Sequence, residues 1–305
     1  MIAIRGVFGP VVTTFVRGSE DVDLEAFRFN VRAHMAAGLA GVVVCGSTGE
    51  AALLGEDERR AVLDAARAET PAGRLVLMGV GAESTRLTIQ RAADAGRAGA
   101  DAVLVVAPHY YSNAMTPAAL RVHYQRVADA SPLPVVLYNI PKYMHFALTP
   151  DLVAELSQHA NIAGIKDSSG DAELFDGYLR SRSDTFAVIT GNGGQLASAL
   201  ARGATAGILG LSLFAGRSCV TIYEAHQRGD AVGAASVQEP LKVVNATLVG
   251  ELGVPGVKAA LDAVGLRGGP VRGPLRDLDA AGVARVREVL ATGGVWPHVA
   301  LAGTK

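Results

Sequence analysis

Residues 161–171 read NIAGIKDSSGD and place one lysine, Lys166, at the end of a short apolar run that small polar residues follow at once. This pattern is typical of a buried strand that ends at a functional site. Burying an ammonium group is costly, and that cost favours the neutral amine, which is a nucleophile toward carbonyls. The alternative is a structural lysine that keeps its charged end in water or pairs with Asp167. This stretch alone leaves both interpretations open.

Apolar strand-like runs alternate with helical patterns on both sides of this stretch. The expected strands cover residues 7–14, 41–45, 75–80, 102–106, 134–138, 162–166, 186–190 and 206–209. The expected helices between them cover residues 23–37, 57–69, 84–98, 117–130, 150–158, 172–180 and 194–201, with Ser84 and Thr116 as N-caps. Eight strands that alternate with helices predict an α/β fold, the (β/α)8 TIM barrel. A doubly wound open sheet is the runner-up, although residues 9–14 (GPVVTT) lack its dinucleotide-binding fingerprint.

The pattern becomes purely helical after the eighth expected strand, at residues 218–227, 231–249, 254–264 and 280–290. We therefore expect a catalytic barrel over residues 1–212 and a C-terminal helical region over residues 213–305 that packs on it. Residues 265–274 indicate a rigid loop, and we expect little regular structure after Gly293.

Composition narrows the classes of function. Half of the residues are hydrophobic, the net charge is −1, and no basic run stands out, which argues against nucleic acid as a partner. Cys45 and Cys219 lie far apart in the sequence and indicate neither a disulfide framework nor a zinc site, and Cys45 is expected in the core. The chain shows neither a signal peptide nor an apolar run of ~18 residues. We therefore expect a cytoplasmic protein with no membrane partner.

In such a barrel the site lies at the C-terminal ends of the strands. Ser47 and Thr48, in the GSTGE sequence of residues 46–50, would cradle a small carboxylate, or they belong to an ordinary tight turn. Tyr138 would relay protons beside Lys166, or it is a strand aromatic with a local partner. The GNGG sequence of residues 191–194 would bind phosphate, or it lets a ligand approach the backbone.

Three further titratable residues have plainer expected roles. No histidine of the chain has a close ligand partner and a carboxylate at a strand end, so we expect no metal-dependent enolate mechanism. His34 and His123 fall in expected helices and are expected to pack there. Glu50 is expected to support the turn or to cap the next helix.

A mechanism follows from this set of residues. The neutral amine of Lys166 attacks the C2 ketone of a 2-oxo acid and, with loss of water, forms an imine, so no cofactor is needed. The protonated imine is an electron sink that permits loss of a C3 proton or cleavage of the C3–C4 bond. Tyr138 moves protons to and from the carbinolamine and the departing or incoming hydroxyl, while Ser47 and Thr48 hold the carboxylate.

Three motifs together, GSTGE at residues 46–50, YNIP at 138–141 and GIKD at 164–167, resemble the dihydrodipicolinate synthase / N-acetylneuraminate lyase superfamily. The resemblance covers nearly the whole chain and implies a class I, Schiff-base-forming lyase or aldolase that handles pyruvate. It also implies a homotetramer built from tight dimers. The catalytic residues that it implies are Lys166, Tyr138, Thr48 and Tyr111, with Tyr111 crossing the dimer interface to complete a hydroxyl relay. The expected substrate-binding residues are Ser47, Thr48, Ser168, Gly191 and Ile208.

Within the superfamily, some motifs bear on a synthase and others resemble an aldolase. Synthases usually carry an arginine two residues after the proline of the tyrosine motif, where it binds the carboxylate of aspartate semialdehyde. Here Lys142 and Tyr143 follow that proline, and lysine is not equivalent to arginine at such a site. Residues 108–111, 156–162 and 268–275 look closer to 4-hydroxy-2-oxoglutarate aldolase, although Thr48 stands where that enzyme commonly has asparagine. In that subgroup Ser168 is thought to help bind the substrate.

The main interpretation is therefore cleavage of a 4-hydroxy-2-oxo acid to pyruvate and an aldehyde. The alternatives within the superfamily are a 4-hydroxy-tetrahydrodipicolinate synthase and a dehydratase or aldolase of 2-keto-3-deoxy sugar acids. Two other classes also stay open: a phosphate-binding barrel isomerase or synthase, and a catalytically silent barrel that binds pyruvate as a sensor. The presence of both Lys166 and Tyr138 argues against the silent barrel.

Overall fold

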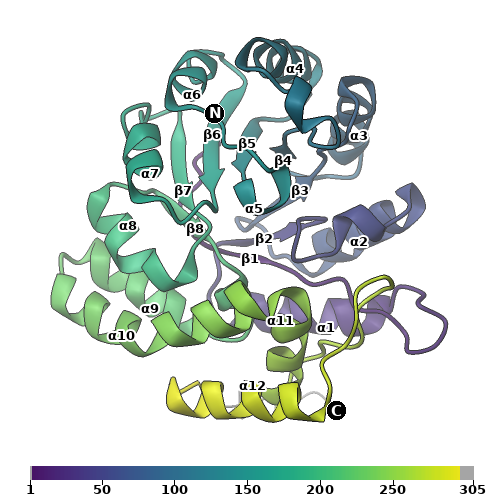
Figure 1. Ribbon diagram of the computed structural model, residues 1–305, viewed down its shortest axis with the longest axis vertical. Coiled ribbons are helices and arrows are strands. Elements are labelled where there is room, and N and C mark those ends of the chain that lie inside the picture. The colour runs from purple at the N-terminus through teal and green to yellow at the C-terminus, as the bar shows by residue number, and fades with distance from the viewer. Residues whose placement is uncertain (1, 296–305) are drawn as a thin grey trace.

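The computed structural model describes residues 2–295 and forms a closed barrel of eight parallel strands in chain order (Figure 1). The predicted (β/α)8 barrel is confirmed, and the open sheet is wrong because β1 pairs with β8 as well as with β2. The strands are β1 (Gly6–Pro10), β2 (Gly41–Val44), β3 (Leu75–Gly79), β4 (Ala102–Val106), β5 (Val135–Asn139), β6 (Ile162–Asp167), β7 (Ala187–Thr190) and β8 (Ala206–Ile208).

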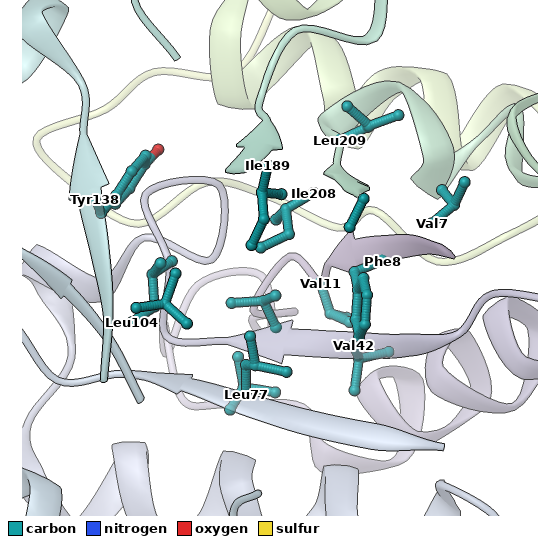
Figure 2. Packing of buried hydrophobic residues seen from close by; sticks show 14 of the residues in the cluster. Val7, Phe8, Val11, Val42, Leu77, Leu104, Tyr138, Ile189, Ile208 and Leu209 are labelled. Atoms are coloured by element: carbon teal, nitrogen blue, oxygen red, sulfur yellow. The ribbon is translucent and has the colours of Figure 1, made fainter. Parts of the chain in front are cut away.

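The strands read as nearly continuous apolar runs because both of their faces are buried. Figure 2 shows side chains from different strands meeting in the core, among them Phe8, Leu77 and Ile208. Neighbouring strands also approach closely at Gly41, where a Cβ atom would lie 2.1 Å from the carbonyl oxygen of Leu75. This core fills the interior of the barrel and leaves its C-terminal end open to carry a site.

Helices surround the strands (Figure 1). The α-helices of the barrel are α1 (Leu24–Ala36), α2 (Glu56–Glu69), α3 (Thr85–Arg97), α4 (Pro117–Ala130), α5 (Pro141–Met144), α6 (Pro150–Leu156), α7 (Ala172–Leu179) and α8 (Leu196–Arg202). Short 3-10 helices occupy η1 (Ala51–Leu53), η2 (Ser112–Ala114), η3 (Gly193–Gln195) and η4 (Gly210–Leu213). The side chains of Ser84 and Thr116 cap α3 and α4 as predicted, by accepting from the amides of Leu87 and Ala119.

Helices α9 (Gly216–Gln227), α10 (Ala231–Val244), α11 (Gly253–Ala263) and α12 (Ala280–Thr292) follow the barrel, with the π-helical segment η5 (Asn245–Glu251) after α10. They lie together on one side of the barrel, where α9 packs between α8 and α10 (Figure 1). The division of the chain at residue 212 stays a prediction. Most of the segment expected to lack regular structure, residues 296–305, lies outside the described residues.

The first two strands end earlier than predicted. Strand β1 stops at Pro10 because the next polar side chains bond to loops: Thr13 Oγ1 donates to the carbonyl oxygen of Gly49 at 2.7 Å, and Thr14 Oγ1 to that of Asp23 at 2.6 Å. Strand β2 stops before Cys45, which is buried as expected but has a left-handed backbone with φ 53°. The turn after β2 then carries Ser47 and Thr48 to the C-terminal end of the barrel.

Two expected helices also differ. The helix expected over residues 231–249 ends as α10 at Val244 and continues as the π-helical segment η5, and the helix expected over residues 194–201 begins with the 3-10 helix η3. Among residues 2–295, no helix combines the length and the apolar character that crossing a membrane requires.

His123 packs inside the protein as predicted, with its Nδ1 atom 2.9 Å from Thr85 Oγ1. Burial lowers the pKa of His123 to about 4, and Arg126 adds to this shift. Between that value and the unfolded value of about 6.5, only the unfolded chain binds the proton, so stability rises with pH. The contribution is complete above pH ~6.5 and is lost as the pH falls toward ~4.

We therefore expect the wild type to lose up to ~3 kcal/mol of unfolding free energy between pH 7 and pH 4 through this residue. A His123→Asn variant keeps a polar group near Thr85 but does not titrate, so its stability should fall less over the same range. Urea unfolding of both proteins at several pH values measures the difference. Parallel pH curves for the two proteins would contradict the assignment.

Candidate active site

Lys166 and Tyr138 lie side by side at the C-terminal end of the barrel. The register of β5 and β6 pairs these two residues directly, and paired residues of neighbouring parallel strands point to the same face. Lys166 Nζ lies 4.0 Å from the centroid of the Tyr138 ring. The two residues are only 6% and 5% exposed, so most of each side chain is enclosed by the protein. Figure 2 shows Tyr138 beside the apolar core of the barrel.

A cavity of about 230 Å³ opens over this pair, and we call it the lysine cavity. It collects most of the residues that the sequence predicted for the site: Ser47, Thr48, Tyr138, Lys166, Ser168, Gly191 and Ile208. They come from the ends of β5, β6, β7 and β8 and from the turn after β2. The structure thus brings hydroxyl groups, one buried amine and close backbone together in a space that suits a small 2-oxo acid.

Tyr111 is the one predicted catalytic residue that does not line the lysine cavity. It lies before η2, is 70% exposed, and meets the ring of Tyr110 edge to face at 5.0 Å. The structure describes one chain, so the expected crossing of a dimer interface stays a prediction. Tyr110 is also exposed, so the two rings form an aromatic pair on the surface.

Asp167 does not neutralise Lys166, which sets aside the ion pair considered from the sequence. Its carboxylate accepts hydrogen bonds from Asn139 Nδ2 at 2.8 Å and from Ser169 Oγ at 2.8 Å. Burial raises the pKa of Asp167, and the hydrogen bonds from Asn139 and Ser169 oppose that rise. Asn139 also accepts from the amide of Leu148 at 2.9 Å. This polar network fixes the ends of β5 and β6, and with them the positions of Tyr138 and Lys166.

Three backbone amides of the glycine-rich loop at residues 191–194 already donate hydrogen bonds within the protein. The amide of Gly191 donates to the carbonyl oxygen of Asp167 at 2.6 Å, that of Asn192 to Thr190 Oγ1 at 3.1 Å, and that of Gly194 to Asn192 Oδ1 at 3.0 Å. Amides already engaged in this way are poor ligands for a phosphate. A Cβ atom at Gly191 would collide with Ser168 Oγ, so glycine here permits close approach, the plainer of the two interpretations.

One residue of the lysine cavity, Asn245, was not identified from the sequence. Its Nδ2 donates at 3.1 Å to Oδ1 of Asn192, a residue of the glycine-rich loop that also lines the cavity. Asn245 begins the π-helical segment η5, and such segments are frequent at functional sites. An isolated asparagine within a helical pattern carries no signal that distinguishes it from a surface residue.

Lys142 and Tyr143 stand at the entrance of the lysine cavity, on the short helix α5. Lys142 Nζ donates to the carbonyl oxygen of Gly250 at 3.1 Å and lies 5.9 Å from the centroid of the Tyr143 ring. Lys142 therefore reaches across the entrance from α5 to η5. Among residues 2–295, no group of three or more His, Cys, Asp or Glu side chains is arranged to hold a metal ion.

A second, larger cavity of about 950 Å³ adjoins the first. The residues that line both cavities are Ser47, Tyr138, Ile140, Lys142, Tyr143, Gly253 and Val254. The second cavity extends along η1 and the ends of β3 and β4, past Glu83 and His109. Its lining is largely apolar, so it offers room for side chains from another molecule directly beside the predicted proton relay.

Comparisons with known proteins agree with this geometry. The family model of the dihydrodipicolinate synthetase family matches residues 3–292. The chain is similar to the 4-hydroxy-tetrahydrodipicolinate synthase of Methanoculleus marisnigri, with 36% identity over 296 residues that cover 95% of this chain and 99% of the relative. It is also similar to the solved structure of a prophage protein of the dihydrodipicolinic acid synthase family from E. coli K12 in complex with pyruvate. That match has a TM-score of 0.91 and 28% identity, and covers 96% and 100% of the two chains.

A third similarity is to the crystal structure of the chloride-inhibited dihydrodipicolinate synthase from Acinetobacter baumannii complexed with pyruvate. It has a TM-score of 0.90 and 28% identity, and it covers 96% of this chain and 99% of the other. All of these matches extend over nearly the whole length of both proteins.

Proposed function

The chain belongs to the dihydrodipicolinate synthetase family, and on this premise we propose that it is a 4-hydroxy-tetrahydrodipicolinate synthase that condenses pyruvate with aspartate semialdehyde. The observation that carries the proposal is the buried Lys166 amine, 4.0 Å from the Tyr138 ring, at the base of a cavity lined by hydroxyl groups. The amine forms an imine with C2 of pyruvate and releases water. Loss of a C3 proton then gives an enamine, whose C3 carbon attacks the aldehyde.

The main interpretation from the sequence, cleavage of a 4-hydroxy-2-oxo acid, fits the relatives less well than this alternative, because they are named as synthases. One observation still favours it as a second candidate. Tyr143 occupies the position where the resemblance places the arginine that binds aspartate semialdehyde, and Lys142 precedes it. Retro-aldol cleavage would use the same lysine and tyrosine in the opposite direction.

A direct comparison of substrates separates the two candidates. We expect kcat/KM for condensation of aspartate semialdehyde with pyruvate to exceed kcat/KM for cleavage of 4-hydroxy-2-oxoglutarate and of a 2-keto-3-deoxy sugar acid. The three reactions are assayed on one preparation of the full chain. Faster cleavage of either hydroxylated acid would reverse the order of the candidates and leave the lysine chemistry intact.

Lys142 is proposed to bind the carboxylate of the second substrate. Its amine lies at the entrance of the lysine cavity, and the bond to the Gly250 carbonyl is easily exchanged for a carboxylate because the side chain is exposed. Lys142→Ala is expected to raise the KM for aspartate semialdehyde roughly 10-fold, the cost of one hydrogen bond to a charged group. The KM for pyruvate should stay the same, and Lys142→Arg should retain most of the activity. Steady-state kinetics with each substrate varied in turn test this, and an unchanged KM for the semialdehyde would refute the role.

The proposed assembly is a homotetramer of tight dimers in which Tyr111 of each subunit enters the second cavity of its neighbour. The support is the 70% exposure of Tyr111 together with an apolar space beside Tyr138. Mixing inactive Lys166→Ala and Tyr111→Phe subunits, after exchange of subunits, is then expected to restore activity. Each mixed dimer would hold one site with an intact lysine and an intact tyrosine.

The control is each variant subjected alone to the same exchange, which should stay inactive or nearly so. Light scattering on the wild type should give the mass of four chains. A monomer in solution, or mixed subunits no more active than their parents, would contradict the assembly.

The proposed chemistry needs no cofactor, because the protonated imine takes up the electron pair of the bond that breaks. The same proposal includes a cytoplasmic location, as expected from the sequence, and small molecules as the only substrates: pyruvate and an aldehyde.

A further inference from the structure

A buried ion pair joins the loop that carries Ser47 and Thr48 to helix α11. Glu50 Oε1 lies 2.5 Å from Lys258 Nζ, and the two side chains are 0% and 2% exposed. A buried pair of this kind contributes little net stability compared with well-packed apolar residues. The pair instead joins two elements that both line the lysine cavity, the turn of Ser47 and Thr48 and helix α11.

The loop is held in a conformation that it would not adopt alone. Both of its ends have left-handed backbones, with φ 53° at Cys45 and φ 55° at Glu50, which side chains with a Cβ atom disfavour. Such conformations persist only where the surroundings hold them, and they gather at functional sites. From the side of β1, Thr13 Oγ1 donates to the Gly49 carbonyl at 2.7 Å. From the other side, the amide of Arg272 donates to Glu50 Oε2 at 2.9 Å.

Lys258 anchors the opposite wall. It belongs to α11, whose residues Gly253, Val254 and Val257 line the lysine cavity. Its amine also donates to the carbonyl oxygen of Pro270 at 2.6 Å and lies 4.5 Å from the centroid of the Phe15 ring. Burial lowers the pKa of Lys258, and the neighbouring Glu50 opposes that shift. Glu50 is thus the largest of the neighbouring groups that favour the charged form of this lysine, with smaller contributions from Asp277 and Asp262.

Arg272 fastens the same loop at its far end. Its guanidinium group donates to the carbonyl oxygen of Leu53 at 2.8 Å and pairs with Glu58 at 2.6 Å. The segment after α11 thus holds both the beginning of η1, through Glu50, and its end, through Leu53. Ser47 and Thr48 are left as the part of the loop that faces the lysine cavity.

We propose that Glu50 and Lys258 are positioning residues for imine formation: their ion pair sets the Ser47–Thr48 turn against α11. The carboxylate of the 2-oxo acid then meets the turn while its ketone meets Lys166. The pair touches no substrate and acts only through the turn. This inference rests on the proposed pyruvate chemistry.

Two variants test the proposal. Glu50→Gln/Lys258→Met removes both charges together, so neither is left buried without a partner. Glu50→Asp keeps the charge but shortens the side chain. In both, kcat/KM for pyruvate is expected to fall ~10- to 100-fold, because small misplacement of an orienting group has effects of this size. The loss should appear mainly in KM, while saturating pyruvate and borohydride should still label Lys166 fully.

The control is the ion pair of Arg67 and Asp101, whose charged atoms lie 2.9 Å apart at the opposite end of the barrel. Asp101 also accepts a hydrogen bond there from the amide of Val76. Arg67→Met/Asp101→Asn should lower the melting temperature and leave the KM for pyruvate unchanged. Melting curves of all variants separate folding from positioning.

The outcomes are distinct. A wild-type KM for pyruvate in either folded variant of the Glu50–Lys258 pair, or an equal rise of KM in the control, would overturn the positioning role alone. Failure of the wild type to form a borohydride-trapped adduct with pyruvate would overturn the proposed function and this inference together.

Discussion

Replacement of Lys166 by alanine is expected to lower kcat by at least ~10⁴-fold, the size of effect seen when a covalent nucleophile is removed. Lys166 is nearly buried at the base of the lysine cavity, and its amine is the group there that would form the imine. The variant should remain folded, because removing this side chain leaves no buried charge without a partner. Steady-state rates measure the loss, with circular dichroism as the test of folding.

The control for this variant is Lys242→Ala. Lys242 lies on the outer surface of α10, where it pairs with Glu239 at 2.5 Å, so its loss should leave kcat close to that of the wild type. A folded Lys166→Ala protein that keeps a substantial part of the wild-type rate would refute the imine mechanism on Lys166. Lys142, which lines the same cavity, would then be the amine to examine.

Replacement of Tyr138 by phenylalanine is expected to lower kcat by ~10²- to 10³-fold, the usual contribution of one positioned proton donor or acceptor. Phenylalanine keeps the ring beside the Lys166 amine and removes only the hydroxyl group. The formation of the carbinolamine and its loss of water should both slow, so rapid-quench trapping with borohydride should show a delayed adduct of normal final yield.

Tyr124→Phe is the matched control, because the hydroxyl of Tyr124 is buried against the carbonyl oxygen of Val105 at 3.5 Å and takes no part in the site. It should retain the wild-type kcat. If Tyr138→Phe trapped pyruvate as fast as the wild type and turned over at a similar rate, the hydroxyl group would have no role in proton transfer. Tyr138 would then be a packing residue.

The barrel was predictable from the sequence because its signals are local and repeated. The bounds of β4 and α4 agree with prediction to the residue, since the apolar run AVLVV and the Thr116–Pro117 cap are short-range features. The predicted bounds were wrong where contacts between residues far apart in the sequence determine the end of an element. The hydrogen bonds of Thr13 and Thr14 to loops shorten β1. No sequence pattern near Pro141 predicts the short helix α5.

Much of the site was also predictable, because parallel strands bring their C-terminal residues to one end of a barrel. This rule alone places Tyr138, Lys166 and Ser168 at one cavity. Tyr111 lies exposed outside the lysine cavity, and its contact with a second chain stays a prediction that the structure of one chain does not test. The positions of Asn245 and of the Glu50–Lys258 pair depend on how the C-terminal helices pack on the barrel. No local sequence motif predicts that packing.

Borohydride reduction in the presence of pyruvate, read by intact mass and peptide mapping, tests the central claim most directly. We expect one reduced pyruvyl adduct per chain, located on Lys166 and absent from the Lys166→Ala protein. Folded wild-type protein that gains no mass, while a related aldolase is labelled in parallel, would contradict it.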